Sequence, residues 1–291
     1  MSEEVVPEEA MSEEVMREET TKISVYFWGT RGSTPVNSPD HRIFGGNTSC
    51  VEVRHGAGRV ICDGGSGLVG LSDSLLGEGA QEIDIFFSHV HADHICGLPF
   101  FKPLFAPGYH VRLHSFDATP DALEKAITGY ISQPLFPIDR SSFQAEVTFH
   151  SHDATRMVNC AGFQISALPI PHPGGAHALK VSTDNRHFVY ATDTEHQAGA
   201  PNTDLIAFMQ HADLAVYDCT YDDDEFDSRI GWGHSTWQEG VRLAQAANVR
   251  RFGIFHHEPG RTDDQLAAIE AQAKDMFDAS FVTRDFSGVD I

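Results

Sequence analysis

Four potential metal ligands lie within six residues at the end of an apolar, strand-like run. The motif H-x-H-x-D-H occupies residues 89–94. Side chains two residues apart on an extended backbone point the same way, so His89 and His91 can hold one ion. Asp93 and His94 come after the chain has turned, so they can reach a second ion beside the first. Imidazole and carboxylate together suit zinc, manganese or iron(II).

Other apolar strands also end in residues with ligand chemistry. Because strands in layered sheets share an edge, residues distant in sequence can converge there. The further strand-end residues are Asp63, His172, Asp193 and His256 or His257. A carboxylate in a glycine turn, as at Asp63, is suited to orient a neighbouring ligand through a hydrogen bond. We therefore expect a composite site at one edge of a sheet.

Length and composition limit the domain organisation and the partners. A chain of 291 residues that is 41% hydrophobic can bury one large core or two fused halves. The formal net charge is −22, which disfavours a large nucleic acid as partner. The 5 cysteines include no C-x-x-C pair, as expected of free thiols in a reducing compartment. The sequence contains neither a membrane-spanning stretch nor a secretion signal, so we expect a cytoplasmic protein.

The chain divides into an acidic tail and one folded domain. Residues 1–20 contain the sequence Met-Ser-Glu-Glu-Val twice and are dense in glutamate, which predicts a disordered tail over 1–21. A single domain is expected over 22–291. Strands are predicted at 23–28, 50–54, 59–62, 83–87, 145–149, 163–168, 187–191, 214–217 and 251–255. Helices are predicted at 120–131 (capped by Asp117 or Thr119), from Ser235 or Thr236 to about 247, and at 262–277.

Taken together, these residues resemble the metallo-β-lactamase superfamily over about 22–285. The resemblance implies an α/β fold, a four-layer αβ/βα sandwich with two metals at the sheet edge. The segment Gly233-His234-Ser235-Thr236 is similar to the phosphodiesterase branch of that superfamily. This branch includes ribonuclease Z, the phosphoribosyl cyclic phosphate phosphodiesterase and related cyclic-nucleotide phosphodiesterases.

The resemblance also implies a full set of ligands for two divalent ions. The expected ligands are His89, His91 and His172 for metal 1, Asp93, His94 and His256 for metal 2, and Asp193 as the bridge. His256 is chosen over His257 because it is the first residue after the strand that ends at Phe255. Zinc is the first expectation, with manganese or iron as alternatives, since His/Asp sites accept all three.

A binuclear centre of this kind supports hydrolysis. Two divalent ions about 3.5–4 Å apart can share a hydroxide, lower its pKa toward neutrality and offset the charge of a phosphate. His234 is expected outside the ligand set, as proton donor to the leaving oxygen or as a phosphate ligand. The other two candidate catalytic residues are Asp93, which could accept the proton of the attacking water, and Asp63. The candidate substrate-binding residues are Arg31, His177, Tyr221, Gly174 and Gly175.

The expected substrate is a small phosphodiester: a cyclic nucleotide, a cyclic phosphate or a short oligonucleotide. The ribonuclease Z family normally carries a long tRNA-gripping arm between the residues that match His172 and Asp193, which are only 21 positions apart here. Three alternatives remain: tRNA 3′ processing, hydrolysis of a carboxyl ester, lactone or thioester, and a non-catalytic metal- or partner-binding module. A redox di-iron protein is disfavoured, because such proteins usually carry Glu in place of His91. The resemblance further implies a homodimer.

Overall fold

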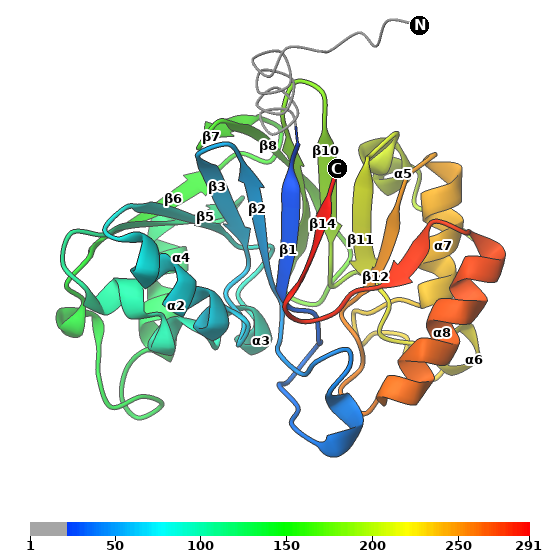
Figure 1. Cartoon of the computed structure of the whole chain (residues 1–291), viewed down its shortest axis with the longest axis horizontal. Helices are drawn as coiled ribbons and strands as arrows, with labels where there is room; N and C mark the ends of the chain where they lie inside the picture. Colours follow the sequence, from blue (N-terminus) through cyan, green and yellow to red (C-terminus); the bar gives the residue numbers. More distant parts are fainter. Residues whose placement is uncertain (1–21) are drawn as a thin grey trace, which may run out of the picture.

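Two seven-stranded sheets face each other and carry helices on their outer faces (Figure 1). This computed structural model describes residues 22–291, so the predicted tail over 1–21 lies outside the described residues. The strand order is β14-β1-β2-β3-β4-β5-β6 in one sheet and β13-β12-β11-β10-β9-β8-β7 in the other. The fold is therefore the expected α/β sandwich of four layers.

The elements have the following bounds. The strands of the first sheet are β1 (Ser24–Gly29), β2 (Cys50–His55), β3 (Gly58–Cys62), β4 (Glu82–Phe86), β5 (His110–Phe116), β6 (Glu146–His152) and β14 (Ser287–Asp290). Those of the second sheet are β7 (Val158–Cys160), β8 (Phe163–Ile170), β9 (Ala176–Ser182), β10 (His187–Ala191), β11 (Leu214–Asp218), β12 (Phe252–Phe255) and β13 (Ser280–Val282). The helices are α2 (Leu68–Glu78), α3 (Ala92–Ile95), α4 (Pro120–Tyr130), α5 (Thr203–Met209), α6 (Asp223–Phe226), α7 (Trp237–Ala246) and α8 (Asp263–Met276).

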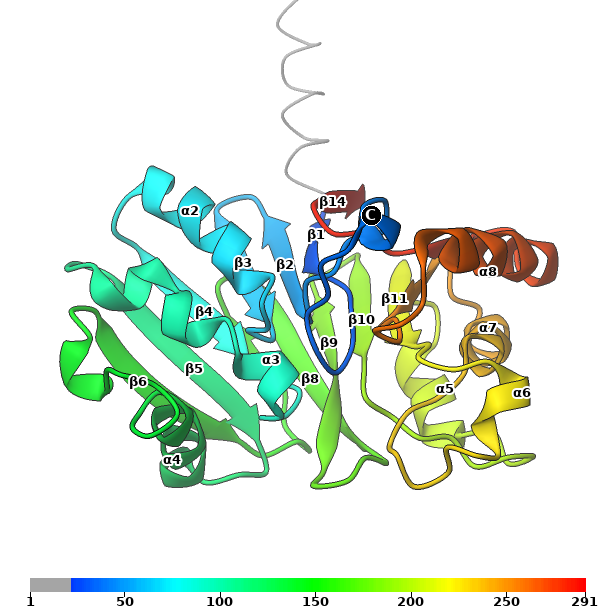
Figure 2. The same ribbon diagram turned by 90° about the horizontal axis from the view of Figure 1, so that it is seen from below.

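Three apolar cores hold the layers together. Between the sheets, Val25 and Phe27 of β1 pack in one cluster with Phe188 and Tyr190 of β10. A second core joins α2 and α4 to the outer face of the first sheet, and a third joins α5, α7 and α8 to the second sheet. Figure 2 shows these helices outside the two layers of strands. None of the helices in the described part of the chain is both long and apolar enough to cross a membrane.

At the start of three helices the structure shows a cap residue that the sequence predicted. Thr119 accepts from the amide of Ala122 at the start of α4, and Thr236 accepts from that of Glu239 at the start of α7. Thr262 forms a capping box with Gln265 at the start of α8. Each cap satisfies an amide that the first turn of a helix leaves without a partner.

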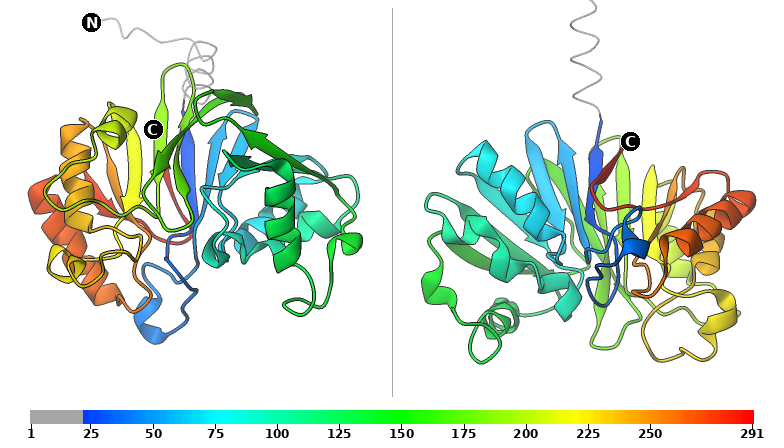
Figure 3. Two further views of the ribbon diagram at one scale, coloured as in Figure 1. Left: turned by 180° about the vertical axis from the view of Figure 1, so that it is seen from behind. Right: turned by 60° about the horizontal axis from the view of Figure 1, so that its bottom comes forward.

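Parallel pairing brings the functional loops to one edge. Strands β3 to β6 are parallel to one another, and so are β10 to β13. Their carboxyl ends therefore lie at the same edge of each sheet, and the loops after β3, β4, β10, β11 and β12 meet there. The C-terminal strand β14 pairs with β1 and so lies beside the first strand of the fold (Figure 3).

Candidate metal centre

Two groups of metal-ligating side chains meet at this edge. In each group the potential ligand atoms all lie within 4.8 Å of one another. The first group consists of His89, His91 and His172, and the second of Asp93, His94, Asp193 and His256. These are the seven residues that the sequence assigned to the two metals, divided as predicted except that Asp193 is grouped with the second set.

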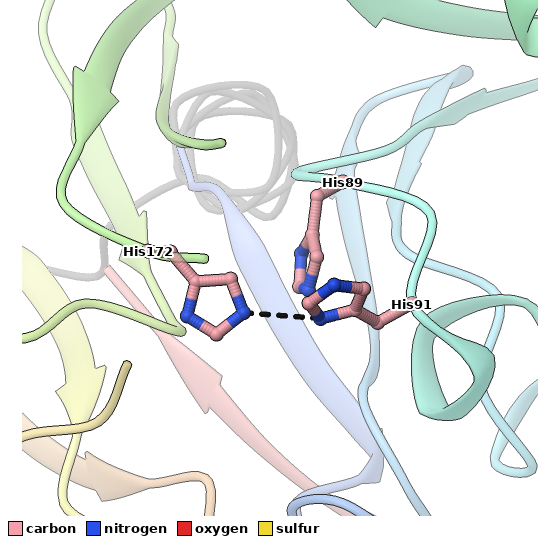
Figure 4. A group of neighbouring side chains, drawn as sticks. All are labelled: His89, His91 and His172. Carbon is pink, nitrogen blue, oxygen red and sulfur yellow. Dashed lines mark hydrogen bonds between the residues drawn. The ribbon is translucent and has the colours of Figure 1, made fainter. Parts of the chain in front are cut away.

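The first group brings together two loops. His89 and His91 lie in the loop after β4, and His172 follows β8. The Nε2 atom of His172 lies 3.0 Å from Nδ1 of His91, and the three side chains converge from the two loops with their rings steeply inclined to one another (Figure 4). The other nitrogen of His172, Nδ1, lies 2.8 Å from the carbonyl oxygen of Gly233. This carbonyl orients the ring and leaves Nε2 directed at its neighbours.

Asp193 connects the two groups. Its Oδ1 lies 3.8 Å from Nε2 of both His89 and His172, and its Oδ2 lies 3.1 Å from Nε2 of His94. The Nε2 atom of His256 lies 3.2 Å from the same Oδ2. One oxygen of Asp193 therefore faces each group, which is the arrangement expected of a bridging carboxylate.

The polar atoms that remain without partners fit bound cations. Nε2 of His89, of His94 and of His256 is buried and makes no hydrogen bond in the described part of the chain. A buried polar nitrogen without a partner is costly, so it calls for a ligand that is not a protein atom. Histidine nitrogens and carboxylate oxygens are the donors that zinc, manganese and iron(II) accept. The residues therefore fit two divalent ions.

Three strand-end residues adopt a backbone conformation that is rare outside glycine. The φ angles are 61° for Asp63, 53° for Asp193 and 58° for His256. Such left-handed conformations cost energy in non-glycine residues and persist where the surrounding structure imposes them. Here each one turns the chain directly after a buried strand, so that the side chain is directed at the sheet edge.

Asp63 is bonded to His94 of the second group, at the ring nitrogen that faces away from the other members of that group. Its Oδ2 lies 2.7 Å from Nδ1 of His94 and also accepts hydrogen bonds from Ser88 Oγ and Tyr190 OH. Its Oδ1 accepts from the amide of Ser88. A carboxylate bonded to the far nitrogen of a histidine fixes the orientation and tautomer of that ring. The structure thus gives Asp63 the orienting position predicted from its glycine turn.

The first glycine-rich loop lies directly against the site. The amide of Ser33 donates to Oδ2 of Asp93 over 2.8 Å. A Cβ atom on Gly32 would lie 2.5 Å from Nδ1 of His256, so only glycine lets this loop approach so closely. This loop therefore helps to position Asp93 and His256, a carboxylate and an imidazole of the second group.

His234 lies beside both groups and is held by a residue to which sequence analysis assigned no role. Its Nδ1 lies 2.9 Å from Oδ2 of Asp218, the last residue of β11. Burial lowers the pKa of His234, but Asp218 and Asp193 raise it by more, to about 9. Asp218 stands at a strand end, as the predicted ligands do, and that signal was available in the sequence.

The carboxylates of the second group are ionised. Burial alone would raise the pKa of Asp193, but His256 and His94 outweigh it and hold the pKa well below its usual range. Burial likewise opposes the effect of His94 and His256 on Asp93, whose pKa is also lowered. Burial lowers the pKa of His89, which favours its neutral ring, whereas the burial of His94 is outweighed by Asp193 and Asp93, which raise its pKa. A bound cation would take the place of the proton on His94. Ionised carboxylates and neutral imidazoles are the forms that coordinate metals.

The choice between the adjacent histidines is answered by their directions. His256 belongs to the second group, whereas Nε2 of His257 lies 2.9 Å from the carbonyl oxygen of Thr283. The hydrogen bond to Thr283 thus holds His257 away from the second group. The structure favours His256, as the sequence did.

The candidate substrate-binding residues fall into three places. His177, Gly174 and Gly175 line a cavity of about 510 Å³ that also includes His89 and His91. Tyr221 is buried, lines a separate cavity of about 210 Å³, and its ring centre lies 6.0 Å from that of His234. Arg31 lines neither of these two cavities and is fully buried.

The prediction for Arg31 is wrong. Its side chain is fully buried, and its guanidinium donates to the carbonyl oxygens of Gly45, Glu258 and Arg261. These bonds join the first loop to the segment after β12. A guanidinium occupied in this way and shielded from solvent cannot contact a substrate.

Comparison with known proteins agrees with this site. A family model described as the β-lactamase superfamily domain matches residues 48–257, which contain all seven predicted ligands. A ribonuclease Z from Natronomonas pharaonis is 26% identical, in an alignment that covers 92% of this chain and 98% of that protein.

Two solved structures share the fold. The metallo-β-lactamase fold protein YhfI from Bacillus subtilis has a TM-score of 0.68 at 19% identity, covering 93% of this chain and 99% of its own. A diphosphatase from the PhnP family also has a TM-score of 0.68 at 19% identity, covering 92% and 97%. At these identities the likeness shows the fold alone.

Proposed function

The chain belongs to the metallo-β-lactamase superfamily, and from that premise we propose that it hydrolyses a small phosphodiester, as an enzyme of the phosphodiesterase branch that includes ribonuclease Z. The substrate class comprises cyclic nucleotides, other cyclic phosphates and short oligonucleotides. The single observation that carries the proposal is the position of His234 beside two groups of metal-ligating side chains joined by Asp193.

The seven side chains of those groups would hold two divalent ions, with zinc as the first candidate and manganese or iron as alternatives. Such ions supply a water molecule of lowered pKa and positive charge beside the phosphate oxygens. Asp193 would be shared between the ions, since its two oxygens face different groups. Asp63 holds His94 in the tautomer whose Nε2 is free for coordination.

His234 would donate a proton to the leaving oxygen. Its Nδ1 is engaged by Asp218, so Nε2 is the nitrogen available to a substrate. Its ring centre lies 5.5 Å from that of His172 and 5.0 Å from that of His256, next to both groups. An alkoxide is a poor leaving group unless it is protonated as the bond breaks, and a positioned imidazolium supplies that proton.

The segment between His172 and Asp193 supports a small substrate. It forms the hairpin of β9 and β10, with a turn at 183–186. These two strands fill the interval, so it contains no additional arm that could grip a large RNA. A net charge of −22 also opposes a large polyanion.

Processing of tRNA 3′ ends is the second candidate, and one observation favours it. The relative from Natronomonas pharaonis that aligns with almost the whole chain is named ribonuclease Z. The same catalytic groups would cut a phosphodiester of tRNA, and the two functions differ in how the substrate is held.

A turnover screen with metal-defined protein tests both candidates. The substrates are bis(p-nitrophenyl) phosphate, 2′,3′-cyclic nucleotides, a precursor tRNA with a 3′ trailer, and a lactone. We expect zinc- or manganese-loaded protein to hydrolyse the small phosphodiesters and chelator-treated protein to be inactive. Cleavage of the precursor tRNA at a far higher kcat/KM would establish the second candidate. Turnover of the lactone alone would refute both.

A further inference from the structure

We propose that Glu195 is a positioning residue that fixes the backbone of His234 against the first group of metal-ligating side chains. Glu195 follows Asp193 by two residues and is itself neither a candidate ligand nor a candidate catalytic residue. Its effect on turnover rests on the proposed function, whereas its contacts do not.

The segment directly before His234 turns at two glycines. The φ angle is 90° at Gly231 and 86° at Gly233, in the left-handed region that favours glycine. Because glycine also populates many other conformations, such a segment keeps one shape only where other residues hold it. His234 is the next residue along the chain, so the position of its backbone depends on those residues.

The carboxylate of Glu195 holds both glycines. Its Oε2 accepts hydrogen bonds from the amide of Gly231 over 2.7 Å and from the amide of Gly233 over 2.8 Å. Gly231 is exposed, so water can replace the carboxylate there, but Gly233 is buried. Within residues 22–291 the amide of Gly233 makes this hydrogen bond alone. Removal of the carboxylate would therefore leave a buried amide without a partner and release the segment.

The same glycine contacts a candidate metal ligand. The carbonyl oxygen of Gly233 lies 2.8 Å from Nδ1 of His172, and a Cβ atom on Gly233 would lie 2.5 Å from that nitrogen. The amide of Glu195 in turn donates over 2.7 Å to the carbonyl oxygen of Pro171, the residue before His172. Glu195 thus connects the loop that carries His172 with the segment that carries His234.

Glu195 and Asp218 hold different parts of His234. Asp218 contacts Nδ1 of the ring, whereas Glu195 fixes the backbone through the preceding residue. Loss of Glu195 would keep the imidazole in place as a group but let its Nε2 move away from the leaving oxygen. A displacement of about 1 Å can cost about 10²-fold in rate.

Two substrates with different leaving groups test this role. p-Nitrophenolate leaves without a proton, whereas the alkoxide released from a 2′,3′-cyclic nucleotide needs one. At saturating zinc, Glu195→Ala should lower kcat for the cyclic nucleotide about 10–100-fold, and kcat for bis(p-nitrophenyl) phosphate less than about threefold. Glu195→Gln retains a side-chain oxygen that can accept from both amides, so it should restore most of the lost rate. Glu195→Asp has a shorter side chain and should show a smaller loss of the same pattern.

A charge-matched variant and a double variant complete the test. Asp227 is exposed and directly follows α6, and Asp227→Ala removes the same charge, so it should leave both rates unchanged. If Glu195 acts through His234, adding Glu195→Ala to His234→Ala should lower the rate less than about threefold further, because the two losses are then not additive.

Amide hydrogen exchange of the metal-free protein tests the contact without turnover. The amide of Gly233 should exchange at least about tenfold faster in Glu195→Ala than in the unchanged chain or in Asp227→Ala. Thermal melting of each variant checks that it is folded.

The outcomes separate the role of Glu195 from the proposed function. Equal losses for the two substrates, no loss for either, or full additivity with His234→Ala would overturn the positioning role. So would an unchanged exchange rate at Gly233. If the unchanged chain hydrolyses neither substrate, the proposed function is refuted, and the exchange rate at Gly233 alone decides whether Glu195 holds the segment.

Discussion

Nδ1 of His234 lies 2.9 Å from a carboxylate oxygen of Asp218, and this contact decides which nitrogen of the imidazole faces the metal centre. Asp218 is itself fully buried and fixed, since its Oδ1 accepts from the hydroxyl of Thr220 and its Oδ2 from the amide of Thr194. The pair thus resembles other histidine–carboxylate pairs in which the carboxylate orients an imidazole that handles protons.

We expect His234→Ala to lower kcat for a small phosphodiester by about 10²–10⁴-fold while both metals stay bound, because it removes a proton donor and no ligand. Asp218→Asn should cost less, since the imidazole remains but is held less firmly. Steady-state kinetics together with metal analysis of each variant provide the measurement. Full activity of His234→Ala would show that the leaving group needs no proton, as for an activated ester.

Removal of Asp63 should act on metal affinity. Asp63→Ala leaves Nδ1 of His94 without its partner, so this ring loses its fixed orientation. Loss of such a supporting carboxylate typically weakens metal binding by about 10–100-fold. Competition with a coloured chelator measures the affinity of each site. A variant that binds both metals as tightly as the unchanged chain would refute the orienting role.

Sequence reasoning found the residues that the structure brings together as candidate ligands, because the constraint on them is local. The candidate ligands and Asp63 follow the ends of β3, β4, β8, β10 and β12. An apolar run followed by a residue that can bind a metal is a pattern that the linear sequence shows directly. Parallel pairing then brings those ends together, a consequence of topology that needs no side-chain detail. Asp218 obeyed the same rule at the end of β11, although the sequence analysis assigned it no role.

The sequence did not show in which direction some side chains point or how deeply they are buried. The sequence placed Arg31 in a glycine-rich loop, where its charge was expected to be open to a substrate. In the structure, the carbonyl oxygens of Glu258 and Arg261, which are 227 and 230 positions away, accept hydrogen bonds from its guanidinium. Strand β5 was missed although Val111 and Leu113 alternate with the half-buried His110 and Arg112, because the pattern ends at His114 and Ser115, which are polar and buried. The cavity beside His91 likewise depends on how α4 packs against the end of β5, which no local pattern encodes.

Paired substitutions at the adjacent histidines test the ligand assignment. His256→Ala should reduce the number of metals bound per chain and abolish hydrolysis, since its Nε2 faces Asp193 and Asp93. His257→Ala should leave metal content unchanged, because Nε2 of His257 bonds to the carbonyl of Thr283 instead. It should still lower stability, since it removes a fully packed side chain. Elemental analysis after dialysis discriminates the two, and the reverse result would transfer the ligand role to His257.

A pH-dependent contribution to stability is expected far from the metal centre, at Asp84. Its carboxylate is buried, accepts from Nε and Nη2 of Arg112 over 2.6 Å each, and lies 2.8 Å from Nε2 of His114. Burial alone would raise the pKa of Asp84, but these hydrogen bonds outweigh it and hold the pKa well below its usual range. The ionised carboxylate therefore favours the folded chain.

The sign of the pH effect follows from that direction. Because the pKa of Asp84 is lower in the folded than in the unfolded chain, its contribution is complete at neutral pH and declines as the pH falls below about 4. We expect Asp84→Asn to lower the free energy of unfolding by about 2–3 kcal/mol at pH 7, and by less at pH 3. Glu82→Gln is the matched control, since Glu82 bonds the same Arg112 but is exposed, and should cost under about 1 kcal/mol. Urea unfolding at both pH values measures the difference, and a loss that grows toward pH 3 would show that Asp84 is protonated in the folded chain.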